Sequence, residues 1–312
     1  MKQKTIRERK PASNMKGSHI SVCICTYRRP DLLWRLLEKL GNQETGELFT
    51  YSIIVVDNDD KKSAKNPVKE LRNKSSIPID YYNEPRNSIP LARNMAVKNA
   101  EGRYVAFIDD DEFPLNDWLL NLYQTYNYYD ADGVLGPVKP HFETAPPRWI
   151  IKGNFFERPS YKTGYILHWK ETRTGNVLLQ KNIFNNSENM FNPEFRHGED
   201  KEFFKRMTEK GYGFVWCNEA PVYETQTSDR FKRTYLLKRA LLRASFSSRH
   251  ASSKLANIYK SLLALTIYTM ALPALFLIGH HIFMKYLIKD FDHIGVLLAA
   301  FGVNVEKYTL LY

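Results

Sequence analysis

The chain has 312 residues, of which 43% are hydrophobic and 25% are charged, and it carries a formal net charge of +11 at pH 7. This length and balance provide ample material for a core and exclude a wholly disordered or fibrous chain. The positive excess is typical of proteins whose partners are nucleic acids, anionic lipids or phosphorylated substrates. Cys23, Cys25 and Cys217 lack metal-binding spacing, so they are predicted to be buried, reduced thiols.

Residues 1–18 are rich in lysine and arginine and contain few apolar side chains. Such a segment buries too little apolar surface to offset the entropy of ordering it, so we predict a basic disordered tail. The segment also lacks the apolar stretch of a secretory signal, which predicts that the folded part stays in the cytoplasm.

Short apolar runs alternate with helical patterns from residue 20 to residue 136. The runs predict strands at 20–25, 52–56, 79–82, 104–108 and 133–135. The patterns between them predict helices at 31–40, 67–72, 89–99 and 116–126. This alternation indicates an α/β fold with a mostly parallel sheet flanked by helices.

Polar side chains follow three of the predicted strands. The segment from Thr26 to Arg29 follows the first strand, Asp57 follows the second, and the acidic run from Asp109 to Glu112 follows the fourth. In open α/β sheets, ligands bind at this edge. Carboxylate oxygens at such spacing suit Mg²⁺ or Mn²⁺ bridging to a phosphate, so the sequence predicts a site for a metal-bound diphosphate.

Each of these polar groups also has a structural explanation that the sequence leaves open. Asp57 can close its loop through an Asx turn, and Thr26 can cap the following helix. The acidic run can occupy the first turn of the helix that follows it. The joint occurrence of the three groups at one edge favours a site.

The region from 137 to 192 is rich in aromatic residues, proline and glycine, and its periodicity is weak. Its clearest element is a predicted strand at 175–179. A predicted helix at 197–207 follows, with acidic residues first and basic residues later, an order that complements the helix dipole.

Six segments, at 22–30, 54–58, 91–94, 102–111, 174–177 and 198–200, carry a family resemblance. In this order they make the chain resemble the family-2 glycosyltransferases with the nucleotide-diphospho-sugar transferase fold called GT-A. The similarity is greatest to bacterial enzymes of exopolysaccharide and lipopolysaccharide biosynthesis. It implies a GT-A domain at 19–230, between the tail and a C-terminal part at 231–312.

The resemblance also implies roles for individual residues. Asp200 matches the catalytic base, and Asp111 matches the ligand of a Mg²⁺ or Mn²⁺ cofactor. The positions that match the nucleotide-sugar-binding site are Thr26, Tyr27, Arg29, Asp57, Arg93, Asp109, Asp110 and Asn176. These roles imply an inverting, metal-dependent enzyme of hexosyltransferase type. It would move a sugar from a nucleotide-diphosphate sugar to a saccharide or lipid-linked acceptor in cell-surface polysaccharide biosynthesis.

Two departures from the family pattern limit these expectations. Glu224 stands where many relatives carry a histidine that reaches the metal or the diphosphate, so the third metal contact stays open. The Gln-x-x-Arg-Trp motif of processive relatives is missing, which favours a single-addition enzyme over a polymerase.

The C-terminal part contains a stretch at 261–284 without Asp, Glu, Lys or Arg, long enough to cross a hydrocarbon core of about 30 Å. Pro273 is expected to interrupt it, and lysines flank both ends. We therefore predict a helical membrane-associating segment at 231–312, as a re-entrant hairpin or an interfacial helix pair on an anionic membrane surface. The expected location is the cytoplasmic face of the inner (cytoplasmic) membrane. A single span, or a helix packed on the catalytic domain or a dimer partner, stays open.

Three other functions are compatible with parts of the pattern. A sugar-phosphate nucleotidyltransferase also combines an α/β sheet with acids and magnesium, but its glycine-rich loop after the first strand is missing here. A nucleic-acid-binding module is disfavoured because the basic residues are dispersed, so we expect no nucleic acid partner. A non-catalytic, membrane-bound scaffold is disfavoured by the intact acids at Asp109, Asp111 and Asp200.

Overall fold

The computed structural model describes residues 6, 8, 17–195, 197–249, 254–303 and 305. Nearly all of the predicted tail therefore lies outside the described residues. The chain divides into two compact units. The first unit comprises Met1–Lys139 and Arg158–Thr225, and the second comprises Pro140–Glu157 and Gln226–Tyr312. The predicted division into 1–18, 19–230 and 231–312 stays a prediction.

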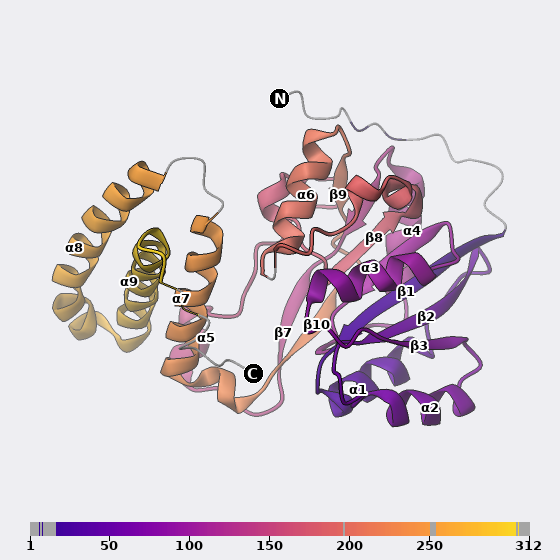
Figure 1. Cartoon of the computed structure of the whole chain (residues 1–312). Helices are drawn as coiled ribbons and strands as arrows, with labels where there is room; N and C mark the ends of the chain where they lie inside the picture. Colours follow the sequence, from indigo (N-terminus) through magenta and orange to yellow (C-terminus); the bar gives the residue numbers. More distant parts are fainter. Residues whose placement is uncertain are drawn as a thin grey trace. The chain divides into compact units, whose positions relative to one another are not determined.

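The first unit is built on a seven-stranded sheet (Figure 1). In spatial order its strands are β3 (Ile79–Asn83), β2 (Phe49–Asp57), β1 (Ser18–Thr26), β4 (Tyr104–Ile108), β8 (Asn176–Gln180), β6 (Gly133–Leu135) and β9 (Phe214–Trp216). Strands β3, β2, β1 and β4 run parallel, whereas β8 is antiparallel to both of its neighbours. The predicted α/β fold with a mostly parallel sheet is confirmed.

Alternate residues of the strands enter two hydrophobic cores. Val22 and Ile24 of β1 belong to one core, and Cys23 between them belongs to the other. This follows from the period of two in a strand. The first core includes apolar faces of α1 (Pro30–Leu40), α2 (Lys65–Lys74) and α4 (Trp118–Tyr128), and the second includes those of α3 (Ile89–Asn99) and α6 (Glu199–Glu209). The helices predicted in the first half are thus present, with shifts of about two residues at their ends.

The three cysteines are free, and Cys23 and Cys217 are buried as predicted. Cys25 is only partly buried, because some of its surface is exposed to solvent. Burial from water raises the pKa of the Cys25 thiol to about 12 and that of Cys217 to about 11. A thiol that stays protonated is a poor nucleophile, so these cysteines are structural.

A second, three-stranded sheet was not predicted from the sequence. Its order is β5 (Glu112–Pro114), β10 (Val222–Gln226) and β7 (Val138–Phe142). Strands β5 and β10 are antiparallel, and Glu112 lies opposite Glu224. The acidic run therefore leads into a strand, and not directly into the helix that the sequence predicts. This pairing carries Glu224 to the edge where β4 ends.

The second unit consists mainly of helices: α5 (Arg148–Gly153), α7 (Arg233–Arg249), α8 (Lys254–Ile278) and α9 (His280–Ala300). Its core includes Ile150, Phe156, Phe231 and Leu236. Helices α7 and α9 approach closely, because a Cβ on Gly295 would lie 2.5 Å from the carbonyl oxygen of Leu241.

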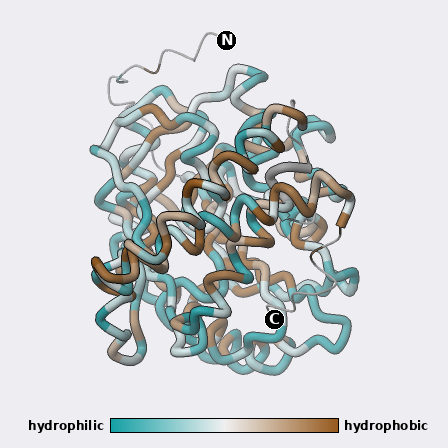
Figure 2. The backbone as a smooth tube through the Cα atoms, turned by 90° about the vertical axis from the view of Figure 1, so that its left-hand side faces the viewer, coloured by the Kyte–Doolittle hydropathy of each residue, from teal (hydrophilic) through white to brown (hydrophobic). Residues whose placement is uncertain are grey.

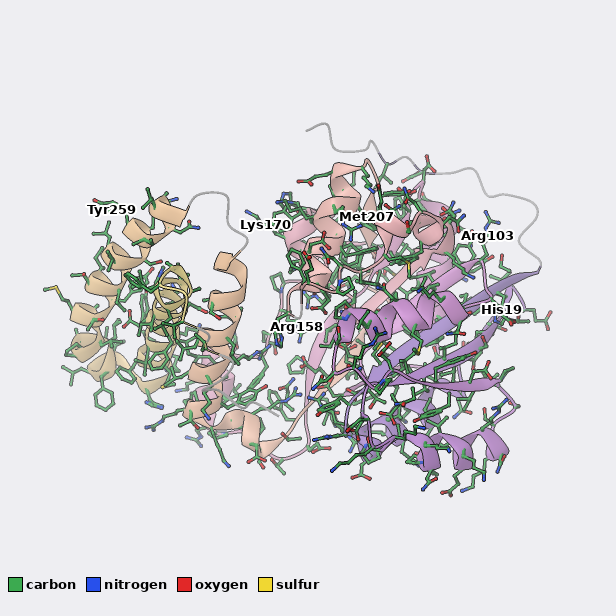
Figure 3. All side chains as sticks on the ribbon, viewed as in Figure 1. His19, Arg103, Arg158, Lys170, Met207 and Tyr259 are labelled. Atoms are coloured by element: carbon green, nitrogen blue, oxygen red, sulfur yellow. The ribbon has the colours of Figure 1, made fainter. Side chains whose placement is uncertain are left out.

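Helix α8 is the one described helix that is long and apolar enough to cross a membrane, over Leu255–Ile278. The expected interruption at Pro273 is wrong, since the helix continues through it and ends before Gly279. A proline removes a single backbone donor, which a long helix tolerates with a kink. Figure 2, viewed from the side where Figure 1 labels α8, shows hydrophobic stretches along the tube. Tyr259, labelled in Figure 3, and Leu277 are largely exposed.

The approach of β1 to the turn before β4 generates a test of the fold. A Cβ on Gly102 would lie 2.4 Å from the carbonyl oxygen of His19, which is backbone and cannot rotate away. We expect Gly102→Ala to lower the free energy of unfolding by about 1–3 kcal/mol, measured by urea denaturation. Gly41→Ala is the matched control, because its Cβ would meet only ordinary contacts at 3.5 Å or more. Equal stability of the two variants would contradict this close approach.

Candidate active site

A run of carboxylates lies at the carboxyl end of β4. Asp109 to Glu112 directly follow Ile108, the last residue of this strand. The side chains of Asp110, Asp111 and Glu112 are buried, whereas that of Asp109 is half exposed. Burial raises the pKa of Asp110 to about 6 and raises that of Glu112 well above its usual range. A charged group in such surroundings requires a partner.

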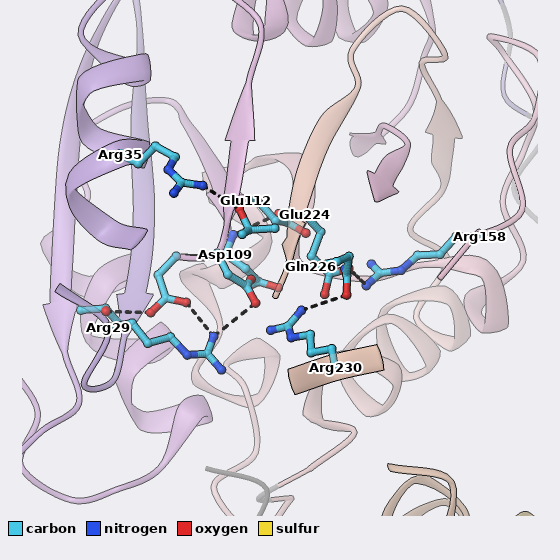
Figure 4. A network of polar contacts seen from close by, with 12 residues as sticks. Arg29, Arg35, Asp109, Glu112, Arg158, Glu224, Gln226 and Arg230 are labelled. Atoms are coloured by element: carbon cyan, nitrogen blue, oxygen red, sulfur yellow. Dashed lines mark hydrogen bonds and ion pairs between the residues drawn. The ribbon is translucent and has the colours of Figure 1, made fainter. Parts of the chain in front are cut away.

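The end of β1 supplies part of this compensation (Figure 4). Arg29 Nη1 donates to Asp110 Oδ1 at 3.1 Å and to Asp111 Oδ2 at 3.3 Å. The hydroxyl of Thr26 donates to Asp110 Oδ2 at 2.7 Å. Because β1 and β4 are parallel neighbours, their carboxyl ends meet at one edge. The structure thus brings together four residues that the sequence predicts for one site.

Helix α3 supplies a second cation. The guanidinium of Arg93 donates to the carboxylate of Glu199, and its Nη2 lies 3.7 Å from Asp109 Oδ1. Both partners of the Arg93–Glu199 pair are buried. Burial raises the pKa of Glu199 to about 7, against the opposing charge of Arg93. Arg93 therefore links the acid run to the beginning of α6.

Asp200 occupies the first turn of α6, next to Glu199. Its Oδ1 accepts a hydrogen bond from the backbone N–H of Lys201 at 2.7 Å, and its side chain is partly buried. The Arg93–Glu199 contact therefore holds the start of α6 beside the acid run. A carboxylate in this position is chemically able to accept a proton from a hydroxyl group.

Asp57 is fully buried, and both of its oxygens are engaged by the protein. Oδ1 accepts from the backbone N–H of Asp59 at 3.1 Å, and Oδ2 accepts from that of Ala64 at 2.8 Å and from the Tyr81 hydroxyl at 3.0 Å. The Asx turn that the sequence left open is therefore present. A role of Asp57 in binding the base of the nucleotide stays a prediction.

Two further predicted residues, Asn176 and Tyr27, differ in how many contacts their side chains make. The amide nitrogen of Asn176 donates to the carbonyl oxygens of Pro137 and Ala220, at 3.0 Å and 2.8 Å. Its Oδ1 accepts from the indole of Trp118 at 2.8 Å. Asn176 thus joins several segments, whereas the ring of Tyr27 is partly exposed beneath the guanidinium of Arg28, 4.8 Å away. Donor binding by both residues stays a prediction.

Sequence reasoning did not assign a role to Glu112, Glu199 or Arg158. Arg158, labelled in Figures 3 and 4, donates to the carboxylate of Glu224. Gly175 fits closely here, because a Cβ on it would lie 2.7 Å from Glu112 Oε1 and 3.0 Å from Asp109 Oδ2. No local sequence pattern predicts these contacts, since they depend on the pairing of β5 with β10.

The carboxylates fit a metal ion that a substrate helps to hold. Over residues 17–195, 197–249 and 254–303, no group of three or more His, Cys, Asp or Glu side chains is arranged to bind a metal alone. Mg²⁺, however, is usually held by one or two carboxylates together with substrate phosphates. Asp111 and its acidic neighbours provide oxygen donors of that kind.

Comparison with known proteins identifies the family. The model of "Glycosyl transferase family 2" matches residues 21–190. The chain belongs to glycosyl transferase family 2. It is therefore a glycosyltransferase, and the acid run at the end of β4 lies within the part that matches the family.

Individual relatives of this family-2 glycosyltransferase have different lengths. The succinoglycan biosynthesis protein ExoM of Rhizobium meliloti is 35% identical over 227 residues, which cover 71% of each chain. The chondroitin synthase of Escherichia coli is 23% identical over 248 residues, 69% of this chain and 36% of that enzyme. The crystal structure of S. aureus TarS 1-349 with UDP-GlcNAc has a TM-score of 0.51 at 19% identity, over 75% of this chain and 68% of that one. This likeness supports the predicted fold.

The buried Arg93 contact generates a prediction on stability and its pH dependence. We expect Arg93→Met to lower the free energy of unfolding by about 3–5 kcal/mol at pH 8, because it leaves buried carboxylates uncompensated. The pKa of Glu199, about 7 when folded, lies above its unfolded value, so the folded state binds this proton more tightly. The free energy of unfolding therefore falls as the pH rises through about 7, and it falls further in Arg93→Met than in the wild type. Urea denaturation at pH 5.5 and pH 8 measures the difference.

The control is the double variant Arg93→Met with Glu199→Gln, which removes the stranded charge as well. It is expected to regain most of the stability lost at pH 8. A penalty of equal size at both pH values, or no recovery in the double variant, would contradict the role of this ion pair.

Proposed function

We propose that the protein is an inverting, metal-dependent glycosyltransferase. It moves a sugar from a nucleotide-diphosphate sugar to a saccharide or lipid-linked acceptor in cell-surface polysaccharide biosynthesis. The observation that carries this proposal is the acid run at the end of β4, tied by Arg93 and Glu199 to the helix that bears Asp200. The similarity to ExoM, named as a succinoglycan biosynthesis protein, supports the substrate class.

The proposed donor site lies at the ends of β1, β2 and β4. Thr26 and Arg29 keep Asp110 and Asp111 in position through the hydrogen bonds described above. Asp111 would hold Mg²⁺ or Mn²⁺, which when bound neutralises charge on the departing diphosphate. Tyr27 and Asp57, with Arg93, Asp109 and Asn176, complete the proposed nucleotide-sugar site.

Asp200 is the proposed base. Its carboxylate takes the proton of the acceptor hydroxyl while the hydroxyl oxygen forms a bond to the anomeric carbon of the donor sugar. The bond from that carbon to the diphosphate breaks, and its electron pair leaves with the diphosphate on the opposite face. The configuration at the anomeric carbon is therefore inverted.

Substitution of the two key acids tests these roles. We expect Asp111→Asn to abolish metal-dependent activity, because an amide binds a divalent cation poorly. We expect Asp200→Asn to lose transfer by a factor of about 10² to 10⁴ while still binding the donor, since only the proton acceptor is removed. The measurement is release of nucleoside diphosphate from uridine, guanosine and thymidine diphosphate sugars with Mn²⁺ or Mg²⁺, together with donor binding.

Asp80→Asn is the matched control, because this carboxylate is half exposed and pairs with Arg72 at the surface. Its activity should equal that of the wild type. Normal turnover by either active-site variant would refute the assignment, and release of pyrophosphate would favour a nucleotidyltransferase.

The proposed location is the cytoplasmic face of the inner membrane, where α8 inserts its apolar side chains. Met270 and Leu277 are 78% and 87% exposed in the described structure, which is unusual for large apolar residues on one helix. Lys285 and Lys289 follow on α9 and are available to anionic headgroups. An acceptor attached to a lipid would then be within reach of a membrane-bound enzyme.

Vesicle flotation tests this attachment. We expect the full chain to bind vesicles of phosphatidylglycerol and phosphatidylcholine. The double variant Met270→Glu/Leu277→Glu should bind them with an affinity lower by about tenfold or more, because a carboxylate is costly at bilayer depth. Leu115→Glu, at an exposed apolar residue of the first unit, is the control and should bind as the wild type does. Equal binding of all three proteins would exclude α8 as the anchor.

A further inference from the structure

Two cationic side chains, Arg173 and Lys201, interact electrostatically with Asp200, and the charge of Arg158 acts on both of them. The ammonium of Lys201 donates to the carbonyl oxygens of Lys170 and Thr172, at 2.7 Å and 2.5 Å. These bonds tie the first turn of α6 to the segment that carries Arg173. We call Arg158, Arg173 and Lys201 the cationic cluster.

The other arginines of the site are paired with carboxylates. Arg29 contacts Asp110 and Asp111, Arg93 contacts Glu199, and Arg158 contacts Glu224.

Two members of the cationic cluster lack such a partner. Within the part of the chain that the structure describes, Arg173 forms no hydrogen bond or ion pair, and Lys201 donates only to backbone carbonyls. Burial, and then the nearby charge of Arg158, lowers the pKa of Arg173. Burial also lowers the pKa of Lys201, which the charges of Arg173 and Arg158 lower further.

Nearby carboxyl groups do not provide the missing partner. Glu224 is engaged by Arg158, and Glu112 Oε2 accepts a hydrogen bond from the backbone N–H of Asp109 at 3.2 Å. The charge of Asp200 acts on both Arg173 and Lys201, but Asp200 bonds to the backbone of its own helix. Arg173 and Lys201 are partly buried, and a cation drawn out of water without an anion is unfavourable, so an anionic ligand would complete the site.

We propose that the cationic cluster binds an anionic group of the acceptor substrate. This proposal rests on the proposed function, in which Asp200 faces the acceptor and Asp111 faces the donor. Because Arg173 and Lys201 lie near enough to Asp200 to interact with its charge, we assign their anion to the molecule that Asp200 deprotonates. A guanidinium binds a carboxylate or a phosphate through two parallel hydrogen bonds. The anion is therefore a carboxylate on a sugar or a phosphate of a lipid-linked acceptor.

Calorimetric titration of the full chain tests the binding without turnover. The probes are a disaccharide that ends in glucuronic acid, and geranyl diphosphate. Cellobiose and geraniol are their uncharged counterparts. EDTA in the buffer removes divalent ions, which suppresses metal-dependent binding at the donor site. We expect one anionic probe to bind and its uncharged counterpart not to bind, and the probe that binds identifies the source of the anion.

Substitution of Arg173 tests its part in this binding. Arg173→Gln should weaken binding of that probe about tenfold or more, since a hydrogen bond to a charged group is lost. Arg173→Lys should restore part of the affinity. Arg72→Gln, which removes an exposed arginine on α2, is the control and should bind as the wild type does.

Stability separates a binding role from a structural one. Removal of a cation that repels its neighbours should leave the free energy of unfolding of Arg173→Gln unchanged or higher. A large loss of stability would show that Arg173 supports the fold, and would overturn the proposal.

Three other results would also overturn it. The first is failure of both anionic probes to bind, and the second is equal binding by Arg173→Gln and the wild type. The third is an increase in the KM of Arg173→Gln for the donor and not for the acceptor. Failure of the proposed function itself would appear separately, as the absence of donor cleavage by the wild type.

Discussion

Compensation of buried carboxylates at the end of β4 is the constraint on which the site depends. Four consecutive acids leave the sheet there, and three of them are buried. A buried carboxylate without a partner costs several kcal/mol, so cations must come from other elements. Arg29 arrives from the end of β1, and Arg93 arrives from α3. The first strand, the third helix and α6 are consequently held around one point.

Strand direction explains how the rest of the site reaches this point. Strands β1, β2 and β4 are parallel, so the residues that follow them lie at the same edge. Strand β8 is antiparallel to β4, and Asn176 at its beginning pairs with Ile108 at the end of β4. The segment before β8, which carries Arg173 and Gly175, is therefore brought to the acid run. One reversed strand thus adds the cationic cluster to the acidic edge.

Much of the fold could be predicted because its long elements have clear periodicity. The strands at the centre of the sheet and the helices between them follow from apolar runs and helical spacing. Strands β5 and β10 were missed because they are short and lack a pattern of their own. Without their pairing, the approach of Glu224 to Glu112 is invisible. Glu199 was missed for another reason: in the sequence it is only an acid at the start of a helix, and its contact with Arg93 joins distant parts of the chain.

Charge balance distinguishes the two substrates of the proposed reaction. A nucleotide-diphosphate sugar brings about two negative charges, and a divalent ion cancels about as many. The donor with its metal therefore adds little net charge to the acid run, where Arg29 and Arg93 already serve the carboxylates. It leaves Arg173 and Lys201 without a counter-charge. Their anion must come with the second substrate, so the same electrostatic requirement that organises the edge of the sheet also selects the acceptor.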